Sequence, residues 1–245
     1  MKPKLAFFSL ACCEGCQLQV LSLEDEILDI LGAVEIVNFR EAIDDRREDY
    51  DIAFIEGSVT RPYDADEVRH IRSKAKVVVA IGACATTGGV NQLKNHHDLR
   101  KTREYVYGSD WAKFDTFATR PVHDVIPVDY ELNGCPIFKE EFLELTKSVL
   151  AGRKFVPKNY PVCVECKMAE NECLYMKGQR CLGVVIRAGC GARCPERGYR
   201  CIGCRGLIDN PNVNAAKDVL EQAGLTVDDV LRDLDLFNTY SEAVR

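Results

Sequence analysis

Cysteines are the residues of this chain whose type and spacing could do chemistry, and there are 13 of them in 245 residues. Eight lie close together in the C-terminal part, which is enough for two complete sets of four. Thiolate quartets that are close in sequence hold either a tetrahedral zinc ion or an iron–sulfur cluster. Two such sets, in a chain with more cysteines upstream, favour electron transfer over a single structural zinc. The eight are Cys163, Cys166, Cys173, Cys181, Cys190, Cys194, Cys201 and Cys204.

Disulfides are the other common use of so many cysteines. Here the cysteine count is odd, the chain is long, and three Cys-x-x-Cys pairs are more typical of metal ligation. The apolar run near the N-terminus is too short for a signal peptide, and Glu14 and the first cysteines follow it at once. No apolar run approaches the ~20 residues of a membrane span. We therefore expect a cytoplasmic, metal-ligating protein with no membrane span.

Composition narrows the class of protein further. Hydrophobic residues make up 47% of the chain and charged residues 29%, which is an ordinary balance for a globular protein. The net charge of −6 argues against nucleic acid as a partner, because nucleic-acid binders carry basic patches. The sequence contains no Walker loop, nucleophile elbow or paired-carboxylate motif. We therefore expect no catalytic residue for covalent chemistry in this chain.

The elements over residues 1–150 must position the upstream cysteines. Apolar runs at 5–10, 34–39, 51–56 and 76–81 indicate buried strands, and a weaker run at 125–128 indicates a fifth. Helical periodicity covers 16–31, 62–74 and 138–150. Continuous apolar strands that alternate with helices are typical of a parallel sheet covered on both faces. The pattern predicts an α/β domain over 1–150, flavodoxin-like, with a doubly wound parallel sheet.

The remaining cysteines follow these predicted strands. Cys12, Cys13 and Cys16 come after the first strand, Cys84 after the fourth and Cys135 after the fifth. The carboxyl ends of parallel strands meet at one edge of a sheet, where such folds bind their ligands. Cys13, Cys16, Cys84 and Cys135 are therefore predicted to hold a third metal centre, and Cys12 is left as a structural thiol. The glycines in these motifs would let the backbone approach a cluster closely.

Several alternatives stand beside this hypothesis. A single buried cysteine is commonly a small hydrophobe, so Cys84 or Cys135 alone would be assigned to the core. A flavin mononucleotide site lacks its phosphate loop after the first strand, and the Cys-x5-Arg pattern of phosphatases is absent from residues 1–150. A zinc-binding structural protein would use the two C-terminal quartets and leave Cys84 and Cys135 unligated.

Residues 151–245 are predicted to form a second domain. Residues 151–161 contain a glycine and two prolines and indicate a linker. From there to Gly206 apolar periodicity is weak, so this segment should build no core of its own, and metal ligation would supply much of its folding energy. Two short helices are expected at 214–223 and 226–236, with Thr226 and Asp229 as a capping pair. The prediction is a loop-rich iron–sulfur cluster domain with short helices.

Taken together, the motifs resemble the small subunits of nickel–iron hydrogenases. They are CCEGCQ at 12–17, EGSV at 56–59, IGACATTGGV at 81–90, GCP at 134–136, and the run from PVCVEC to CIGCRG at 161–206. The likeness is greatest to the cytoplasmic, multi-subunit (group 3) type, such as sulfhydrogenase delta subunits and F420-non-reducing hydrogenase small subunits. It covers nearly the whole chain.

The resemblance implies an electron-transfer subunit with three [4Fe–4S] clusters. The nickel–iron site would lie in a separate large subunit, and electrons would pass to a flavin/NAD(P)-type or ferredoxin-type iron–sulfur subunit. Glu14 and Glu56 would lie near the first cluster, as solvated carboxylates. Ile137 stands where the family pattern often has a proline, and we expect this replacement to affect packing only. The implied ligands are Cys13, Cys16, Cys84 and Cys135 (proximal), Cys163, Cys166, Cys173 and Cys181 (distal), and Cys190, Cys194, Cys201 and Cys204 (medial).

Two further hypotheses belong to the same chemistry. The cluster subunit of a complex I-type respiratory enzyme would carry only the proximal cluster, so the C-terminal quartets count against it. A self-standing ferredoxin-like carrier would leave the first 150 residues without a purpose.

Overall fold

Five parallel strands form one sheet in the computed structural model, which describes residues 2–211, 218–219, 221–224 and 226–238. The strand order is β2-β1-β3-β4-β5, the order of flavodoxin. The predicted flavodoxin-like sheet is therefore confirmed. The strands are β1 (Lys4–Ser9), β2 (Glu35–Asn38), β3 (Ile52–Glu56), β4 (Val77–Ile81) and β5 (Tyr130–Leu132).

The fifth strand differs from the prediction at 125–128. Pro127 has no N–H to donate to a ladder, and the chain before it forms the 3-10 turn η3 (Val122–Asp124). The strand begins after Asp129, whose carboxylate accepts hydrogen bonds from the Val78 N–H at 2.8 Å and from Arg72 at 2.6 Å. This anchor on β4 starts the pairing at Tyr130 instead.

The predicted helix over 16–31 is two helices, α1 (Gly15–Leu21) and α2 (Asp25–Ala33). The break buries Leu23, which is 1% exposed, and turns the chain at Glu24 with φ at 55°. Periodicity could not show the break because the apolar residues continue across it. The other two predicted helices are confirmed as α3 (Pro62–Lys74) and α6 (Lys139–Leu150).

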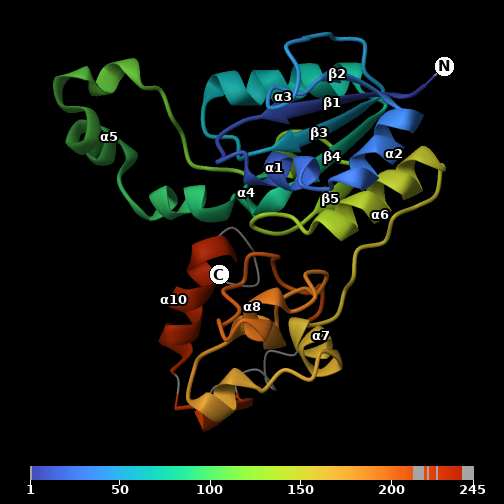
Figure 1. Cartoon of the computed structure of the whole chain (residues 1–245). Coiled ribbons are helices and arrows are strands. Elements are labelled where there is room, and N and C mark those ends of the chain that lie inside the picture. Colours follow the sequence, from blue (N-terminus) through green and yellow to red (C-terminus); the bar gives the residue numbers. More distant parts are fainter. Residues whose placement is uncertain (1, 212–217, 220, 225, 239–245) are drawn as a thin grey trace.

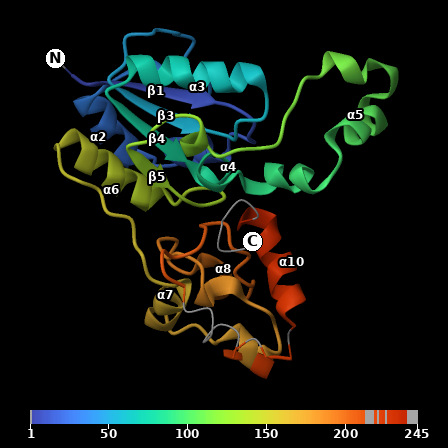
Figure 2. The same ribbon diagram turned by 180° about the vertical axis from the view of Figure 1, so that it is seen from behind.

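Helices cover both faces of the sheet (Figures 1 and 2). On one face α1, α2 and α6 bury a core in which the rings of Phe7, Phe54 and Phe142 lie together, and Ile137 joins this core at 2% exposed. On the other face α3 packs against the alanines and valines of the central strands. The packing role expected of Ile137 is consistent with this position.

An arm leaves the body of the molecule after β4, and no sequence pattern indicated it. It follows the short helix α4 (Gly82–Thr87) and consists of η1 (Gly89–His96), α5 (Leu99–Tyr107) and η2 (Gly108–Lys113). Both views show α5 standing away from the sheet (Figures 1 and 2). Neither α5 nor η2 buries a residue.

Beyond residue 151 the chain forms a second, loop-rich part that lies below the sheet in Figure 1. Its elements are α7 (Val162–Met168), η4 (Leu174–Lys177), η5 (Leu182–Val184), α8 (Arg193–Glu196) and α10 (Val227–Asn238). The expectation of no core is corrected in part, because Val162, Leu182 and Ile186 form a small cluster with Leu234 from α10. Cysteines supply much of the rest of that cluster.

The predicted helix at 226–236 is confirmed as α10, which packs against η1 and α4 of the sheet part. Thr226 and Asp229 exchange hydrogen bonds at its start, as the capping pair requires. The predicted helix at 214–223 falls mostly outside the described residues. Among the helices that the structure describes, none has the length and apolar character needed to cross a bilayer.

Candidate metal centres

The first four predicted ligands meet at the carboxyl edge of the sheet. Cys13 and Cys16 lie at the start of α1 after β1, Cys84 lies in α4 after β4, and Cys135 follows β5. Burial, with a smaller contribution from the Cys135 and Cys13 thiols, raises the pKa of Cys84 to about 12. Burial, then the Cys13 thiol, raises the pKa of Cys135. The structure thus brings together the residues that the strand-end argument selected.

Glycines keep the space around these sulfurs open. A Cβ at Gly82 would lie 2.4 Å from Cys16 Sγ, and one at Gly89 would lie 2.9 Å from Cys84 Sγ. Both glycines have positive φ, at 84° and 57°, a region that side chains rarely adopt. The motif IGACATTGG therefore needs its glycines both for backbone shape and for room beside two thiols.

Glu56 corrects an expectation, because it is buried (2% exposed) and not solvated. It ends β3, and its two carboxylate oxygens accept hydrogen bonds from the Cys16 and Gln17 backbone N–H groups, both at 3.0 Å. These amides are at the start of α1, where Glu14 makes no side-chain cap. Glu56 therefore performs the capping from a distant strand and fixes the backbone that carries Cys16. Glu14 is partly exposed.

The first C-terminal quartet surrounds α7 and η4. Burial, then the thiols of Cys181, Cys166 and Cys173, raises the pKa of Cys163 to about 11. A Cβ at Gly183 would lie 3.6 Å from both Cys163 Sγ and Cys181 Sγ, so these two thiols face the same point. The structure brings this predicted quartet together.

The second C-terminal quartet lies between the first one and the sheet. Burial, followed by neighbours that include the thiols of Cys190 and Cys194, raises the pKa of Cys204 to about 12. Burial also raises the pKa of Cys201 well above its usual value, with further contributions from the thiols of Cys181, Cys204 and Cys190, of which Cys181 belongs to the first quartet. These four cysteines therefore also lie within electrostatic reach of one another.

Direct contacts join the three groups in a fixed spatial order. The Cys204 thiol lies within electrostatic reach of Cys135, in the sheet-edge group, because the backbone and the thiol of Cys135 both act on the pKa of Cys204. The Cys181 Sγ accepts a hydrogen bond from the Cys201 N–H at 3.4 Å. The quartet with Cys204 and Cys201 thus lies between the sheet-edge group and the quartet with Cys181.

All three groups consist of thiols, a donor set that iron–sulfur clusters use and that zinc can also use. Burial raises the pKa of Cys84, Cys163 and Cys204, so a bound metal centre would displace the protons of these thiols. Zinc draws its sulfurs to about 2.3 Å from one centre, whereas a four-iron cluster spreads its cysteines over separate irons. The donor set is all-thiol, as such clusters require.

Two polar residues that sequence reasoning missed support the first site. The Asn91 side chain donates to the Ala11 carbonyl at 2.7 Å and to Ser58 Oγ at 2.9 Å, which joins the loops after β1 and β3. Gln17 is fully buried and donates to Ser9 Oγ at 2.7 Å. The Ala11 and Ser58 partners of Asn91 are 80 and 33 residues away, so only the tertiary structure reveals them.

A flavodoxin-like sheet with cysteines at its strand ends, followed by a cysteine-rich segment, defines an iron–sulfur protein of the oxidoreductase class. Residues 13–149 match the family model described as NADH ubiquinone oxidoreductase, 20 Kd subunit. The chain is 37% identical to sulfhydrogenase 2 subunit delta of Pyrococcus furiosus, over 96% of this chain and 98% of that protein. It is 30% identical to a subunit of the vhu F420-non-reducing hydrogenase of Methanocaldococcus jannaschii, over 97% and 94%. The chain belongs to this family, among the small subunits of hydrogenases.

Solved structures agree with this assignment. A crystal structure of NAD+-reducing [NiFe]-hydrogenase matches with a TM-score of 0.59 and 27% identity, and covers 64% of this chain and 96% of that chain. The Ni-Fe-Se hydrogenase of Desulfomicrobium baculatum matches with a TM-score of 0.56, over 89% of this chain and 98% of that one. At 16% identity, the second match supports the fold alone.

Proposed function

We propose that this chain is the electron-transfer small subunit of a multi-subunit nickel–iron hydrogenase. In this proposal it passes electrons between the nickel–iron site of a large subunit and a redox partner subunit through three [4Fe–4S] clusters. The observation that carries the proposal is the spatial order of the cysteine groups: the Cys204 thiol lies within electrostatic reach of Cys135, and the Cys181 thiol accepts a hydrogen bond from the Cys201 N–H. Three sites in direct succession are what a relay of electrons needs.

The proposed ligand sets keep the division made from the sequence. The proximal set is at the sheet edge, the medial set lies next to it through Cys204, and the distal set follows through Cys181. When bound, such clusters supply one-electron carriers whose potentials depend on hydrogen bonds to sulfur and on burial. The ligands are Cys13, Cys16, Cys84 and Cys135; Cys190, Cys194, Cys201 and Cys204; and Cys163, Cys166, Cys173 and Cys181.

The chain's own residues would bind, bury and space these carriers. Glu56 holds the amides at the start of α1, and Gly82 leaves room for the Cys16 sulfur. Each of the three groups has at least one exposed cysteine, namely Cys13 and Cys135, Cys194, and Cys173, while Cys16 and Cys201 are buried.

The arm gives the large subunit a surface to bind. Tyr105 is 92% exposed and Val106 59%, on a helix that buries none of its own residues. The arm begins directly after α4, which carries Cys84, and it lies within residues 13–149 that the family model matches. We assign the large subunit to the side of the molecule that carries the arm and the proximal cysteines. A flavin/NAD(P)-type or ferredoxin-type iron–sulfur subunit is assigned to the side that carries the distal quartet.

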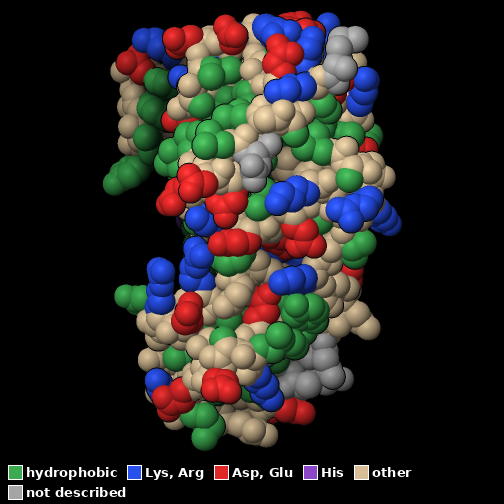
Figure 3. All heavy atoms as spheres, turned by 45° about the vertical axis from the view of Figure 1, so that its right-hand side comes forward, with side chains coloured by type: hydrophobic (Ala, Val, Ile, Leu, Met, Phe, Trp, Pro, Cys, Tyr) green, Lys and Arg blue, Asp and Glu red, His purple; other side chains and the backbone are tan. Residues whose placement is uncertain are grey.

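Two other expectations belong to the proposal. Residues 1–150 and 151–245 act as two domains, the first with the proximal cluster and the second with the other two. The complex works in the cytoplasm and binds no nucleic acid. Charges of both signs are interspersed over the face in Figure 3, so this face carries no large basic patch of the kind that nucleic-acid binders use.

Purification through a tag on this chain, without oxygen, tests the function. We expect a nickel-containing large subunit to co-purify and the complex to reduce a viologen dye with hydrogen. A variant with Cys204 replaced by serine should keep the nickel-containing partner and lose most of the dye reduction that runs through the distal end. Purification of the chain without any nickel-containing partner would contradict the proposal.

A further inference from the structure

Arg205 is the largest fully buried side chain among the described residues, at 2% exposed. It directly follows Cys204 in the sequence. Its guanidinium donates in three directions. Nε donates to the Ala188 carbonyl at 2.8 Å, and Nη1 donates to the Asn133 carbonyl at 2.5 Å. Nη2 lies 2.9 and 2.8 Å from the two carboxylate oxygens of Glu141. Burial of such a charge is costly unless its donors are matched, and here each nitrogen has an acceptor.

The acceptors of Arg205 belong to both parts of the molecule. Ala188 lies in the cysteine-rich part, whereas Asn133 lies two residues before Cys135, and Glu141 is on α6 of the sheet part. One planar side chain therefore joins the segment of Cys204 to the loop of Cys135. Lysine could not reproduce this, because its single ammonium has no planar fork.

Glycine at position 189 makes room for this side chain. A Cβ at Gly189 would lie 2.2 Å from Arg205 Nη2 and 2.6 Å from Glu141 Oε1. The Gly189 N–H donates to Glu165 Oε1 at 3.0 Å, and Glu165 lies between Cys163 and Cys166 on α7. The buried polar groups around Arg205 thus touch the chain segments of all three cysteine groups.

We propose that Arg205 is a positioning residue for electron transfer, which fixes the separation between the proximal and medial sites. This inference rests on the proposed function. In the step concerned, one electron leaves a reduced proximal cluster and reduces the oxidised medial cluster, and no bond or proton changes. The rate of such a step falls steeply with distance, so a small movement of Cys204 relative to Cys135 slows it.

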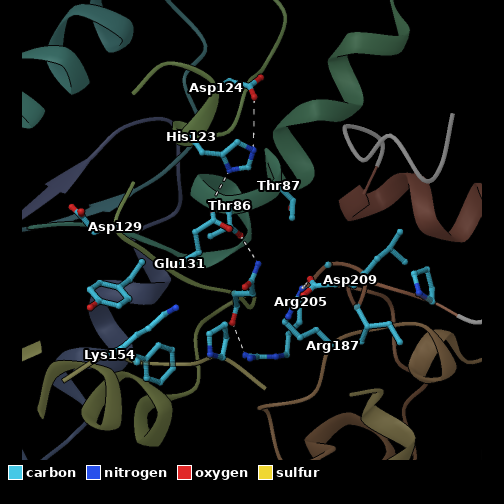
Figure 4. A pocket seen from close by; sticks show the side chains of 18 residues that line it. Thr86, Thr87, His123, Asp124, Asp129, Glu131, Lys154, Arg187, Arg205 and Asp209 are labelled. Carbon is cyan, nitrogen blue, oxygen red and sulfur yellow. Dashed lines mark hydrogen bonds and ion pairs between the residues drawn. The ribbon is translucent and has the colours of Figure 1, made fainter. Parts of the chain in front are cut away.

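Arg187 provides a matched control. It lies on the same side of the cavity of about 770 Å³ between the two parts as Arg205, across from His123 and Thr86 (Figure 4). Its guanidinium bonds to Asp209 at 2.6 Å and to the Leu207 and Lys158 carbonyls, all within the cysteine-rich part. Loss of Arg187 removes a comparable side chain and leaves the link to the Cys135 loop in place.

The experiment compares R205M, R205K and R187M in the intact complex. Iron content reports assembly, and EPR of the reduced protein reports magnetic coupling between the two nearest clusters. Exchange of hydrogen isotopes reports the large subunit alone, and dye reduction at the distal end reports the relay. For R205M we expect retained iron, unchanged exchange, weaker coupling and dye reduction lower by about tenfold or more. R187M should match the wild type in all four measurements.

Wild-type coupling and dye reduction in R205M with its iron retained would overturn the inference. If R205M loses iron, R205K decides: lower coupling with full iron supports the inference, and wild-type coupling overturns it. Iron loss from both, with R187M intact, would assign Arg205 to cluster retention and would also overturn the spacing role. A wild-type complex without three clusters would refute the proposed function instead, which separates the two failures.

Discussion

Replacement of Gly82 by alanine tests whether the proximal site needs the empty space beside the Cys16 sulfur. The new Cβ would lie 2.4 Å from Cys16 Sγ, so the sulfur must move by roughly an ångström to reach ordinary contact distance. The backbone at Gly82 has φ at 84°, which costs about 1–2 kcal/mol for a residue with a side chain. The displaced ligand should lose the proximal cluster and with it the folding energy that ligation supplies.

Gly32 offers the matched control. It lies inside α2, and a Cβ there meets no atom within 4 Å. G32A should raise stability by about 0.5–1 kcal/mol, because alanine favours the helix over glycine. The assay is iron content together with resistance to urea, without oxygen. G82A should lose about four of about twelve irons per chain and unfold at lower urea than the wild type, and a G82A protein with full iron and wild-type resistance would refute the reasoning.

Three more predictions follow from individual contacts. Glu56→Ala leaves two buried amides of α1 without acceptors, so unfolding should become easier by about 1–3 kcal/mol in urea titrations, and Glu56→Gln should recover part of this. The hydrogen bond to Glu131 raises the pKa of His123 above 6.5, so its protonated form stabilises the fold at low pH, and this is lost as the pH rises through the raised pKa. His123→Gln should therefore lower the melting temperature at about pH 5.5 and not at about pH 9, and an equal effect at both would contradict this. Tyr105→Ser, on the arm, should weaken co-purification of the large subunit and leave the iron content unchanged. Leu28→Ser, on α2 and 63% exposed, is the control and should leave the complex intact. An intact complex with Tyr105→Ser would exclude the arm from this contact.

Burial explains which elements the sequence could predict. The central strands are buried on both faces, so nearly every residue in β3 and β4 is apolar and the pattern is unmistakable. The β5 prediction at 125–128 is wrong because Pro127 interrupts the ladder and the Asp129 side chain determines where pairing starts. Within the arm, α5 and η2 bury no residue, and without burial there is no apolar period to recognise.

The same reasoning separates the predicted site residues from the missed ones. Cysteine quartets are visible in sequence because their ligands are close together or follow strands that end at one edge. Arg205 is not visible, because its acceptors Glu141 and Asn133 are 64 and 72 residues away. Glu56 looked like a solvated acid for a similar reason. One signal could have indicated the role of Glu56. The N-cap position of α1 is Glu14 and not Ser, Thr, Asp or Asn, so the first amides of the helix need an acceptor from elsewhere.

The split of the C-terminal cysteines shows how the structure supports a proposal made from sequence. Cys181 lies close to both quartets, since the Cys201 N–H donates to its sulfur. Cys163 and Cys181 nonetheless face one point beside Gly183, whereas Cys204 faces Cys190 and Cys135. These contacts support Cys181 as a ligand of the distal set, as the resemblance implies.

Iron, acid-labile sulfide and zinc in the complex purified without oxygen, with EPR after reduction, test the central claim most directly. The account predicts about twelve irons and as many sulfides from this chain, with signals of reduced [4Fe–4S] clusters that interact magnetically. About four irons would leave only the proximal cluster and point to a relative of the complex I-type subunit. Two zinc ions and no iron would contradict the account of an electron relay.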